Sequence, residues 1–477
     1  MDVRVLDVGD EYADYLQDES RRVGHAGKIA FPKSGNEVRE ALQAATENNW
    51  PVTVQGGRTG ISGGCVPEGG LILNLSRMNA IGEIKGDQMT VQPGALLVDI
   101  RTAIKGSGLL FPSDLTETTA SIGGMVANNA SGARSFRYGA VRNWIQALEV
   151  VLANGETVRV ERGVHKADGV DFGFGSIEGK LPCIEQPDVK SAAGYFVEPD
   201  MDLVDLFVGA EGTLGVVTEI TIKLLPEPVE INCLTAFFAS EEEAVGFVRF
   251  LRAGSTPPPT AIEFFDARSL ELLRRMKVEN AAFAELPELN PEFHTAIYFE
   301  FDCDVPDAVI EKAGEAIDCW FAEGGREIEA LKGFRHAIPE GVNMLIGERK
   351  KTIPELTKLG TDMSVPDDQL EVVMRMYHEG LAEAGLEYVI FGHIGNNHVH
   401  VNIIPRSMEE YGKGKALYLD WARQVVAMGG SVSAEHGIGK NKTEFLKLMH
   451  GECGIREMRK LKHLFDPHGM LNPGNLF

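Results

Sequence analysis

The chain has 477 residues, a hydrophobic fraction of 44%, and 70 acidic against 46 basic residues, which gives a formal net charge of −24. This length predicts two or three domains, and the negative charge argues against nucleic acid or an anionic membrane as a partner because both would repel the protein. The six cysteines are scattered without a C-x-x-C pair, which argues against a zinc finger, an iron–sulfur cluster or a redox dithiol. The first residues lack the apolar core of a signal peptide and no apolar run could span a bilayer, so we expect a cytoplasmic protein without a transmembrane segment.

The first third of the sequence alternates short apolar runs with glycine-rich turns, which is typical of an α+β fold. A capping-box pattern at 34–37 predicts a helix. Residues 51–55 predict a strand that runs directly into a loop with five glycines at 56–64. Residues 163–202 are rich in Gly, Pro and charge and show little periodicity, which predicts a long excursion over the surface or the cofactor. Further strands are expected at 71–75, 89–91 and 147–152.

The pattern of apolar and polar residues changes after Pro226-Glu-Pro228, where we place a domain boundary. Ser240 and Glu243 predict the start of a helix, and the alternating residues Ile297 to Cys303 predict a half-buried strand. Strands that alternate with amphipathic helices indicate a second α+β domain. Residues 465–474 contain too many turn formers to continue a helix, so the tail is expected to close against a part of the fold that is already built.

The glycine loop at 56–64 can approach a ligand closely and expose several backbone N–H donors, as the binding of a pyrophosphate requires. It contains neither the G-x-G-x-x-G fingerprint of the Rossmann fold nor the G-K-[ST] of a P-loop. Taken alone, such a loop after a strand is more often a simple turn.

A cluster of histidines follows at 393–402. If residues 398–403 form a strand, His398, His400 and Asn402 share one face, and His393 can fold back toward them. Two histidines and a carboxylate are the usual ligands of a catalytic divalent metal with open positions, and Glu435 offers the carboxylate. The alternative is a set of surface or hydrogen-bonded core histidines.

The glycine-rich motifs of the first half, in their order, resemble the FAD-binding domain of the vanillyl-alcohol-oxidase type; they stand at 51–64, 111–114, 121–132, 138–139 and 209–215. Because members that bind FAD covalently through the glycine loop use a histidine, and none stands between Gln55 and Gly64, we expect non-covalent FAD. By this resemblance the pyrophosphate would be held by Gln55, Gly56, Gly57, Arg58, Thr59, Gly60, Ser62 and Gly63. The rest of the dinucleotide would be lined by Pro112, Ser113, Asp114, Thr119, Ser121, Gly123, Gly124, Asn128, Ala130, Ser131, Gly132, Glu211, Gly212, Gly215, Val216, Val217 and Asn472.

The second half carries G-H-x-G-x-x-x-x-H at 392–400, S-A-E-H-G-I-G at 433–439 and a closing D-P-x-G-x-L-N-P at 466–473. Together these motifs resemble the FAD-linked C-terminal domain of D-lactate dehydrogenases, D-2-hydroxyglutarate dehydrogenases and the flavin subunit of glycolate oxidase. The resemblance implies a FAD-binding domain of two α+β subdomains at 1–226, completed by 455–477, and an α+β substrate (cap) domain with an antiparallel sheet at 227–454.

The same resemblance implies roles for single residues. His393, His400 and Glu435 would bind a divalent metal (Zn, Mn or Fe), and Arg335 and Asn402 would contact the substrate. His436 would be the catalytic base, and an ordinary histidine pKa would suit that role. The reaction implied is oxidation of a small D-2-hydroxy acid by hydride transfer to flavin, with electrons leaving to an electron-transferring flavoprotein, an iron–sulfur subunit or a quinone.

Two departures affect the expected substrate. The related loop carries Asp-Gly-Asn where this chain has Asn396-Asn397-His398, which leaves the role of His398 open. D-2-hydroxyglutarate enzymes have a lysine two places before the Asp of a D-x-S-x-P segment, where this chain has Leu359 or Gly360, with Lys358 displaced. A monocarboxylate such as D-lactate is therefore favoured, with D-2-hydroxyglutarate, glycolate, a non-oxidising ether-lipid-synthase-like reaction, or a non-catalytic flavin subunit as alternatives.

Overall fold

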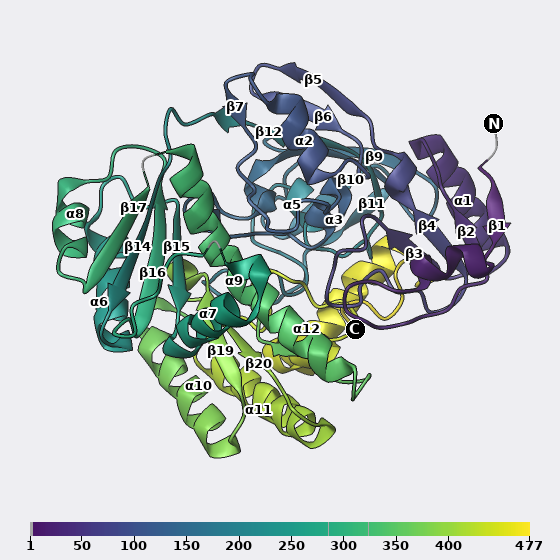
Figure 1. The fold of residues 1–477 in the computed structure, drawn as a ribbon. Helices are drawn as coiled ribbons and strands as arrows, with labels where there is room; N and C mark the ends of the chain where they lie inside the picture. The colour runs from purple at the N-terminus through teal and green to yellow at the C-terminus, as the bar shows by residue number, and fades with distance from the viewer. Residues whose placement is uncertain (1–2, 285, 323) are drawn as a thin grey trace.

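The computed structural model describes residues 3–284, 286–322 and 324–477 and shows a mixed fold of helices and mainly antiparallel sheets (Figure 1). The sheets of the first half and the seven-stranded sheet of the second half lie side by side in the view, with the yellow C-terminal segment returning to the purple and blue first half. The α+β fold class predicted from the sequence is confirmed. Within the described ranges, no helix is both long and apolar enough to cross a membrane.

The first sheet has four strands in the order β1 (Val5–Asp7), β2 (Lys28–Ala30), β4 (Leu71–Asn74) and β3 (Val52–Gln55). Strands β2, β4 and β3 run parallel, and β1 is antiparallel to β2. Helix α1 (Gly35–Glu47) begins where the Ser34 hydroxyl accepts a hydrogen bond from the Glu37 N–H, as the capping pattern predicts. Its apolar face packs against this sheet.

The second sheet is antiparallel and has the order β5 (Ile81–Lys85), β6 (Gln88–Val91), β12 (Val216–Lys223), β8 (Ile145–Val151) and β9 (Thr157–Glu161). The short helices α2 (Leu97–Ile104), α3 (Ile122–Ala127), α4 (Ser135–Tyr138) and α5 (Val204–Phe207) belong to the same half of the chain. Strand β7 (Leu109–Leu110) pairs with β13 (Leu225–Pro226) at the end of this half.

The excursion at 163–202 contains a hairpin that the sequence pattern does not predict, formed by β10 (Asp171–Phe174) and β11 (Ile177–Lys180). Phe172 and Phe174 point to the same side of β10, and their ring centroids lie 6.1 and 5.7 Å from that of Phe465, near the C-terminus. A contact so distant in sequence stabilises a hairpin that local composition does not indicate.

The second half forms a seven-stranded sheet in the order β17 (Asp318–Ala322), β14 (Asn232–Phe238), β16 (Thr295–Phe301), β15 (Ala261–Phe265), β19 (Tyr388–Gly392), β20 (His400–Ile403) and β18 (Leu359–Gly360). Every neighbouring pair is antiparallel. The helices around it are α6 (Glu241–Gly254), α7 (Ala267–Glu279), α8 (Asp307–Ala313), α9 (Gly325–Lys350), α10 (Leu370–Ala384) and α11 (Met408–Ala427).

The strand predicted to be half-buried, β16, is buried along its whole length, so that prediction is wrong. It lies between β14 and β15 in the middle of the sheet. Helix α6 packs on one face, and α7 and α9 pack on the other, so both sets of alternating side chains are covered.

Helix α12 (Thr443–Phe465) leads the chain back to the first sheet, where Leu471 forms a parallel bridge with Val52. The tail therefore closes against the first sheet, as expected. We propose that the boundary lies after residue 226, because among the described residues no strand before it pairs with a strand after it. We also propose that residues 455–477 complete the first domain, because Leu471 bridges to Val52.

Candidate active site

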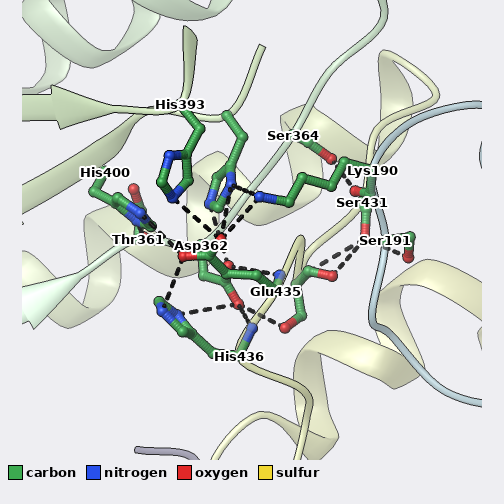
Figure 2. A network of polar contacts seen from close by, with 12 residues as sticks. Lys190, Ser191, Thr361, Asp362, Ser364, His393, His400, Ser431, Glu435 and His436 are labelled. Carbon is green, nitrogen blue, oxygen red and sulfur yellow. Dashed lines mark hydrogen bonds and ion pairs between the residues drawn. The ribbon is translucent and has the colours of Figure 1, made fainter. Parts of the chain in front are cut away.

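His393, His400 and Glu435 converge although they come from three separate segments (Figure 2). His393 follows β19, His400 is the first residue of β20, and Glu435 lies in the loop between α11 and α12. The His393 Nε2 atom lies 3.2 Å from Glu435 Oε2, and the His400 Nε2 atom lies 3.3 Å from Glu435 Oε1. The predicted three residues are thus close enough for their ligand atoms to meet at one ion.

The orientation of the two imidazoles fits a metal. His400 Nδ1 lies 2.9 Å from the Thr361 carbonyl oxygen, which can only accept a hydrogen bond, so Nδ1 carries a hydrogen and the other ring nitrogen, Nε2, faces Glu435. His393 Nδ1 similarly lies 2.6 Å from the Glu263 carboxylate. A carboxylate or carbonyl behind the imidazole is the usual support of a metal-binding histidine, because it leaves the other ring nitrogen free to face the ion.

The charges of this cluster favour ionised carboxylates. Burial would raise the pKa of Glu435, but Lys190, His393 and His398 hold it well below its ordinary value. Burial would likewise lower the pKa of His393, but the carboxylates of Glu263 and Glu435 raise it. Without a bound ion these carboxylates therefore attract a proton to His393, and a bound cation would replace that proton.

His436 stands next to the same carboxylate and is supported by Asp362. Its Nε2 lies 3.3 Å from Glu435 Oε1, and its Nδ1 lies 3.4 Å from Asp362 Oδ2. Asp362 is buried and also accepts hydrogen bonds from Lys442 Nζ at 2.6 Å, the Ser433 hydroxyl at 2.6 Å, and the backbone N–H groups of Glu435 and His436. Asp362 therefore holds the orientation of the His436 ring.

The expectation of an ordinary pKa for His436 is wrong. Burial would lower it, but the nearby Asp362 and Glu435 carboxylates more than offset burial and raise the pKa to about 9. At neutral pH and without a metal, His436 is therefore protonated. A cation at Glu435 would oppose this charge and favour the neutral ring that a base requires.

The fully buried His398 occupies a position between Lys190 and Asp362. Its Nδ1 lies 3.3 Å from Lys190 Nζ, and its Nε2 lies 3.2 Å from Asp362 Oδ1. An ammonium group can only donate, so Nδ1 accepts and Nε2 carries the hydrogen. Burial and the positive charge of Lys190 lower the pKa of His398 well below its ordinary value, so the ring is neutral. In this arrangement Nδ1 accepts from Lys190, and a ring nitrogen of His398 also lies within 4.8 Å of the ligand atoms of His393, His400 and Glu435.

Arg335 and Asn402, the predicted substrate contacts, line the same cavity as the histidines. Arg335 is buried in α9, and in the described part of the chain it forms no ion pair; its Nη2 lies 3.2 Å from His336 Nε2. Asn402 is buried in β20, and its amide has no hydrogen bond among the described residues. A buried guanidinium without an anion is well suited to bind a carboxylate.

One cavity of about 1710 Å³ joins the histidine cluster to the glycine loop of the first half. Ordinary ligand pockets measure about 300–1,000 Å³, so this one has room for a dinucleotide and a small substrate together. Two features fit an FAD molecule: the buried Ser131 hydroxyl has no hydrogen-bond partner among the described residues, and a Cβ on Gly60 would stand in open space. The predicted cofactor residues line this cavity except for six, namely Gly63, Pro112, Ser113, Asp114, Thr119 and Val216.

Among these six residues, two have clear structural roles. Asp114 forms ion pairs with Arg101 at 2.8 Å and with Arg134 at 3.7 Å, which engages its carboxylate. Val216 begins β12 and is buried in the core against α1. We propose from the family resemblance alone that these six residues contact the cofactor.

The glycine loop packs tightly against the start of α3. The Gly57 N–H donates to the Ser121 hydroxyl at 3.0 Å, and a Cβ on Gly57 would stand 2.9 Å from the Thr119 carbonyl oxygen. Glycine is needed here for the close approach of two backbones. Arg58 adopts a left-handed φ of 61° and places its guanidinium over the Tyr15 ring. These contacts fix the shape of the loop at the wall of the cavity.

Glu211, predicted as a cofactor residue, also joins the two halves of the site. Its carboxylate accepts hydrogen bonds from the backbone N–H groups of Ile438 at 2.7 Å and Gly439 at 2.8 Å, in the loop that carries Glu435. Asn472 donates to the Glu211 carbonyl at 2.6 Å and accepts from the Val54 N–H at 2.7 Å. The motifs of both halves are therefore held together around the cavity.

Sequence reasoning missed Lys190, Glu263 and Asp362 as members of the site. Asp362 was visible within the D-x-S-x-P segment but received no role. Lys190 lies in a stretch without periodicity, and Glu263 lies in a buried strand. Neither carries a local signal, because both reach the site only through the tertiary fold.

Comparison with known families agrees with this geometry. The family described as "FAD linked oxidases, C-terminal domain" matches residues 227–476, and the "FAD binding domain" family matches residues 26–161. The chain belongs to this family of FAD-linked oxidases. A FAD-dependent oxidoreductase is therefore the class that fold and site define.

Among the similar proteins, the D-lactate dehydrogenase of Archaeoglobus fulgidus is 32% identical over 456 residues, which covers 94% of this chain and 90% of the relative. The glycolate oxidase subunit GlcD of Bacillus subtilis is 30% identical over 459 residues, covering 94% and 88%. The D-2-hydroxyglutarate dehydrogenase of Stutzerimonas stutzeri is 28% identical over 495 residues, covering 99% and 96%.

The solved structure of an alkyldihydroxyacetonephosphate synthase has the same fold, with a TM-score of 0.67. The two chains share 16% sequence identity, and the alignment covers 98% of this chain and 82% of the synthase. At this identity the similarity concerns the fold alone. The relatives support FAD-linked oxidation of D-2-hydroxy acids in general.

Proposed function

We propose that this protein oxidises a small D-2-hydroxy acid, with D-lactate as the favoured substrate, and that it binds FAD non-covalently and a divalent metal (Zn, Mn or Fe). The observation that carries the proposal is the meeting of His393, His400, Glu435 and His436 in one cavity. The same cavity contains the glycine loop and Arg335, which forms no ion pair with another described residue. An ether-lipid-synthase-like reaction is less well supported, since the related dehydrogenases align along nearly the whole chain at higher identity.

Each proposed residue has a defined task. Arg335 binds the substrate carboxylate, and Asn402 contacts the substrate from β20. His436 receives the hydroxyl proton at Nε2, while Asp362 orients the ring from the Nδ1 side. When bound, the flavin supplies the hydride acceptor, and the metal supplies Lewis acidity that lowers the pKa of the hydroxyl.

The substrate side chain separates two candidates. D-Lactate is favoured because Leu359 or Gly360 stands where a lysine is found in the D-2-hydroxyglutarate enzymes that the sequence resembles. Lys358 favours the second candidate, D-2-hydroxyglutarate, because it lines the cavity and forms no ion pair within the described ranges. Burial alone lowers the pKa of Lys358. The second carboxylate of a substrate would give this lysine the anionic partner that no described residue provides.

An anaerobic titration of the oxidised flavoprotein tests the function. We expect D-lactate to bleach the flavin spectrum, L-lactate to leave it unchanged, and removal of the metal by a chelator to abolish the response. Greater efficiency with D-2-hydroxyglutarate, lost in Lys358→Met while the D-lactate response is retained, would select the second candidate. A flavin that none of the 2-hydroxy acids reduces would contradict the proposed function.

Arg335→Ala is expected to weaken substrate binding more than turnover. A charge-assisted contact contributes about 1.5–3 kcal/mol, which corresponds to roughly a 10- to 100-fold increase in KM. Steady-state kinetics with D-lactate measure KM and kcat separately. Arg326→Ala, which removes an exposed arginine from the same helix, is the matched control and should behave like the wild type. An unchanged KM in Arg335→Ala would contradict the assignment.

We further propose that the reduced flavin passes its electrons to an external acceptor in the cytoplasm, such as an electron-transferring flavoprotein, an iron–sulfur subunit or a quinone. The sequence supports this because it contains neither a C-x-x-C pair for a cluster nor a nicotinamide-binding fingerprint. The acceptor that re-oxidises the reduced protein fastest in stopped-flow mixing would identify the class.

A further inference from the structure

Lys190 enters the site from the first half of the chain, although the proposed metal ligands all belong to the second (Figure 2). Its backbone is held in place, because its carbonyl oxygen accepts a hydrogen bond from the Ser364 hydroxyl at 2.6 Å. The next two residues are fixed as well: the Ser191 and Ser431 hydroxyls lie 2.9 Å apart, and the Ala192 N–H donates to the Ser433 carbonyl at 2.8 Å. The position of Lys190 is therefore determined by the fold.

The ammonium group of Lys190 contacts the same Glu435 oxygen that faces His393. Its Nζ lies 2.8 Å from Glu435 Oε2 and 3.3 Å from His398 Nδ1, and the side chains of Lys190 and Glu435 are each only 8% exposed. The neutral His398 accepts from Lys190 and so keeps the ammonium directed at Glu435. Screening by water is weak at such a buried position, so the charge of Lys190 acts strongly on its neighbours.

Each of the two central carboxylates has its own lysine. Lys190 pairs with Glu435, and Lys442 pairs with Asp362 at 2.6 Å. The imidazoles of His393 and His400 are neutral when they bind a metal. Because each carboxylate is paired with a lysine, a divalent ion bound here would keep nearly its full positive charge. That charge would attract the substrate, whose carboxylate and hydroxyl oxygen together become doubly negative as the hydroxyl proton leaves. Without Lys190, Glu435 would cancel part of that charge.

We infer that Lys190 is a positioning residue that holds the Glu435 carboxylate. Its fixed charge weakens metal binding while strengthening the attraction between the bound metal and the anionic substrate. The inference rests on the metal site in the proposed function. It leads to an unusual expectation: removing a residue of the site should tighten metal binding, because a positive charge beside the ion repels it.

Three variants separate charge from placement. Lys190→Met removes the charge and the hydrogen bond, Lys190→Gln removes the charge but keeps an N–H donor, and Lys190→Arg keeps both. Lys180→Met is the matched control, because Lys180 is an exposed lysine that pairs with Asp171 at the surface. FAD absorbance and thermal unfolding verify that each variant is folded.

The experiment measures the affinity of the metal-stripped flavoprotein for Zn²⁺ and for Mn²⁺ by competition with a chromogenic chelator, and separately the kcat for D-lactate. We expect Lys190→Met and Lys190→Gln to bind the ion roughly 10-fold more tightly and to lose about 10- to 100-fold in kcat. Lys190→Arg and Lys180→Met should remain close to the wild type.

The outcomes distinguish the inference from the proposed function. If the wild type binds neither ion, the proposed metal site fails. If the wild type binds and Lys190→Gln binds equally or more weakly, the inference about the charge of Lys190 is overturned while the metal site stands. Should Lys190→Met fail to fold, Lys190→Gln alone decides between these results.

Discussion

His436→Ala is expected to retain FAD and to lose about 10²- to 10⁴-fold in kcat, the range typical of removing a general base. The imidazole lies between the Asp362 and Glu435 carboxylates, and no other group in the described cavity wall has both this support and this position. The FAD loop is formed by the first half of the chain, so the cofactor should remain bound. Anaerobic stopped-flow reduction of the flavin by D-lactate measures the rate directly.

His463→Ala is the control for this prediction, because His463 is exposed near the end of α12 and should change nothing. Asp362→Asn gives a second comparison. It removes the negative charge that raises the pKa of His436 and should leave the ring poorly oriented, so an intermediate rate is expected. A turnover near that of the wild type in His436→Ala would remove this histidine from the mechanism.

The sequence was a good guide wherever a pattern is local. The hydroxyls of Ser34 and Ser240 cap α1 and α6 as predicted, since a capping box involves residues only three positions apart. The motifs around His393 and Glu435 indicated residues that meet, and His398 also lies beside His400 as the alternation predicts, with the ring centroids 4.5 Å apart. The strand begins at His400, and Asn397 adopts a left-handed φ of 51° just before it.

The remaining features depend on contacts between distant segments, which no local pattern specifies. Burial of β16 on both faces follows from its place in the sheet order, and the β10–β11 hairpin depends on Phe465. The pKa of His436 depends on Asp362, 74 residues away in sequence. Lys190 reaches Glu435 across 245 residues. Electrostatics inside a protein is thus the property that sequence predicts least well.

The two halves of the chain complete each other at the site. Glu211 binds the backbone of the loop that carries Glu435, and Lys190 binds the carboxylate of Glu435 itself. Both contacts reach from the half that holds the glycine loop to the half that holds the histidines. A small displacement between the halves would therefore change the flavin position and the metal ligand set together, which couples cofactor binding to the proposed catalytic geometry.

His393→Ala and Glu435→Gln are expected to have the largest effect of all, because each removes a proposed metal ligand and leaves two. Both should lose bound metal while retaining FAD, and kcat with D-lactate should fall by at least about 10³-fold, equivalent to roughly 4 kcal/mol of lost stabilisation. Glu435→Gln keeps the size of the side chain, so its effect reports the charge and not the packing. Metal content by elemental analysis and flavin content by absorbance measure the two losses separately.

His378→Ala is the matched control, because His378 also faces a carboxylate, with its Nε2 2.8 Å from Glu241, but lies on α10 outside the cavity wall. It should keep both metal and turnover. If Glu435→Gln retained a full complement of metal, the ion would be bound elsewhere. If it lost the metal and still turned over normally, the ion would be dispensable, and His436 and Arg335 would have to account for the oxidation without it.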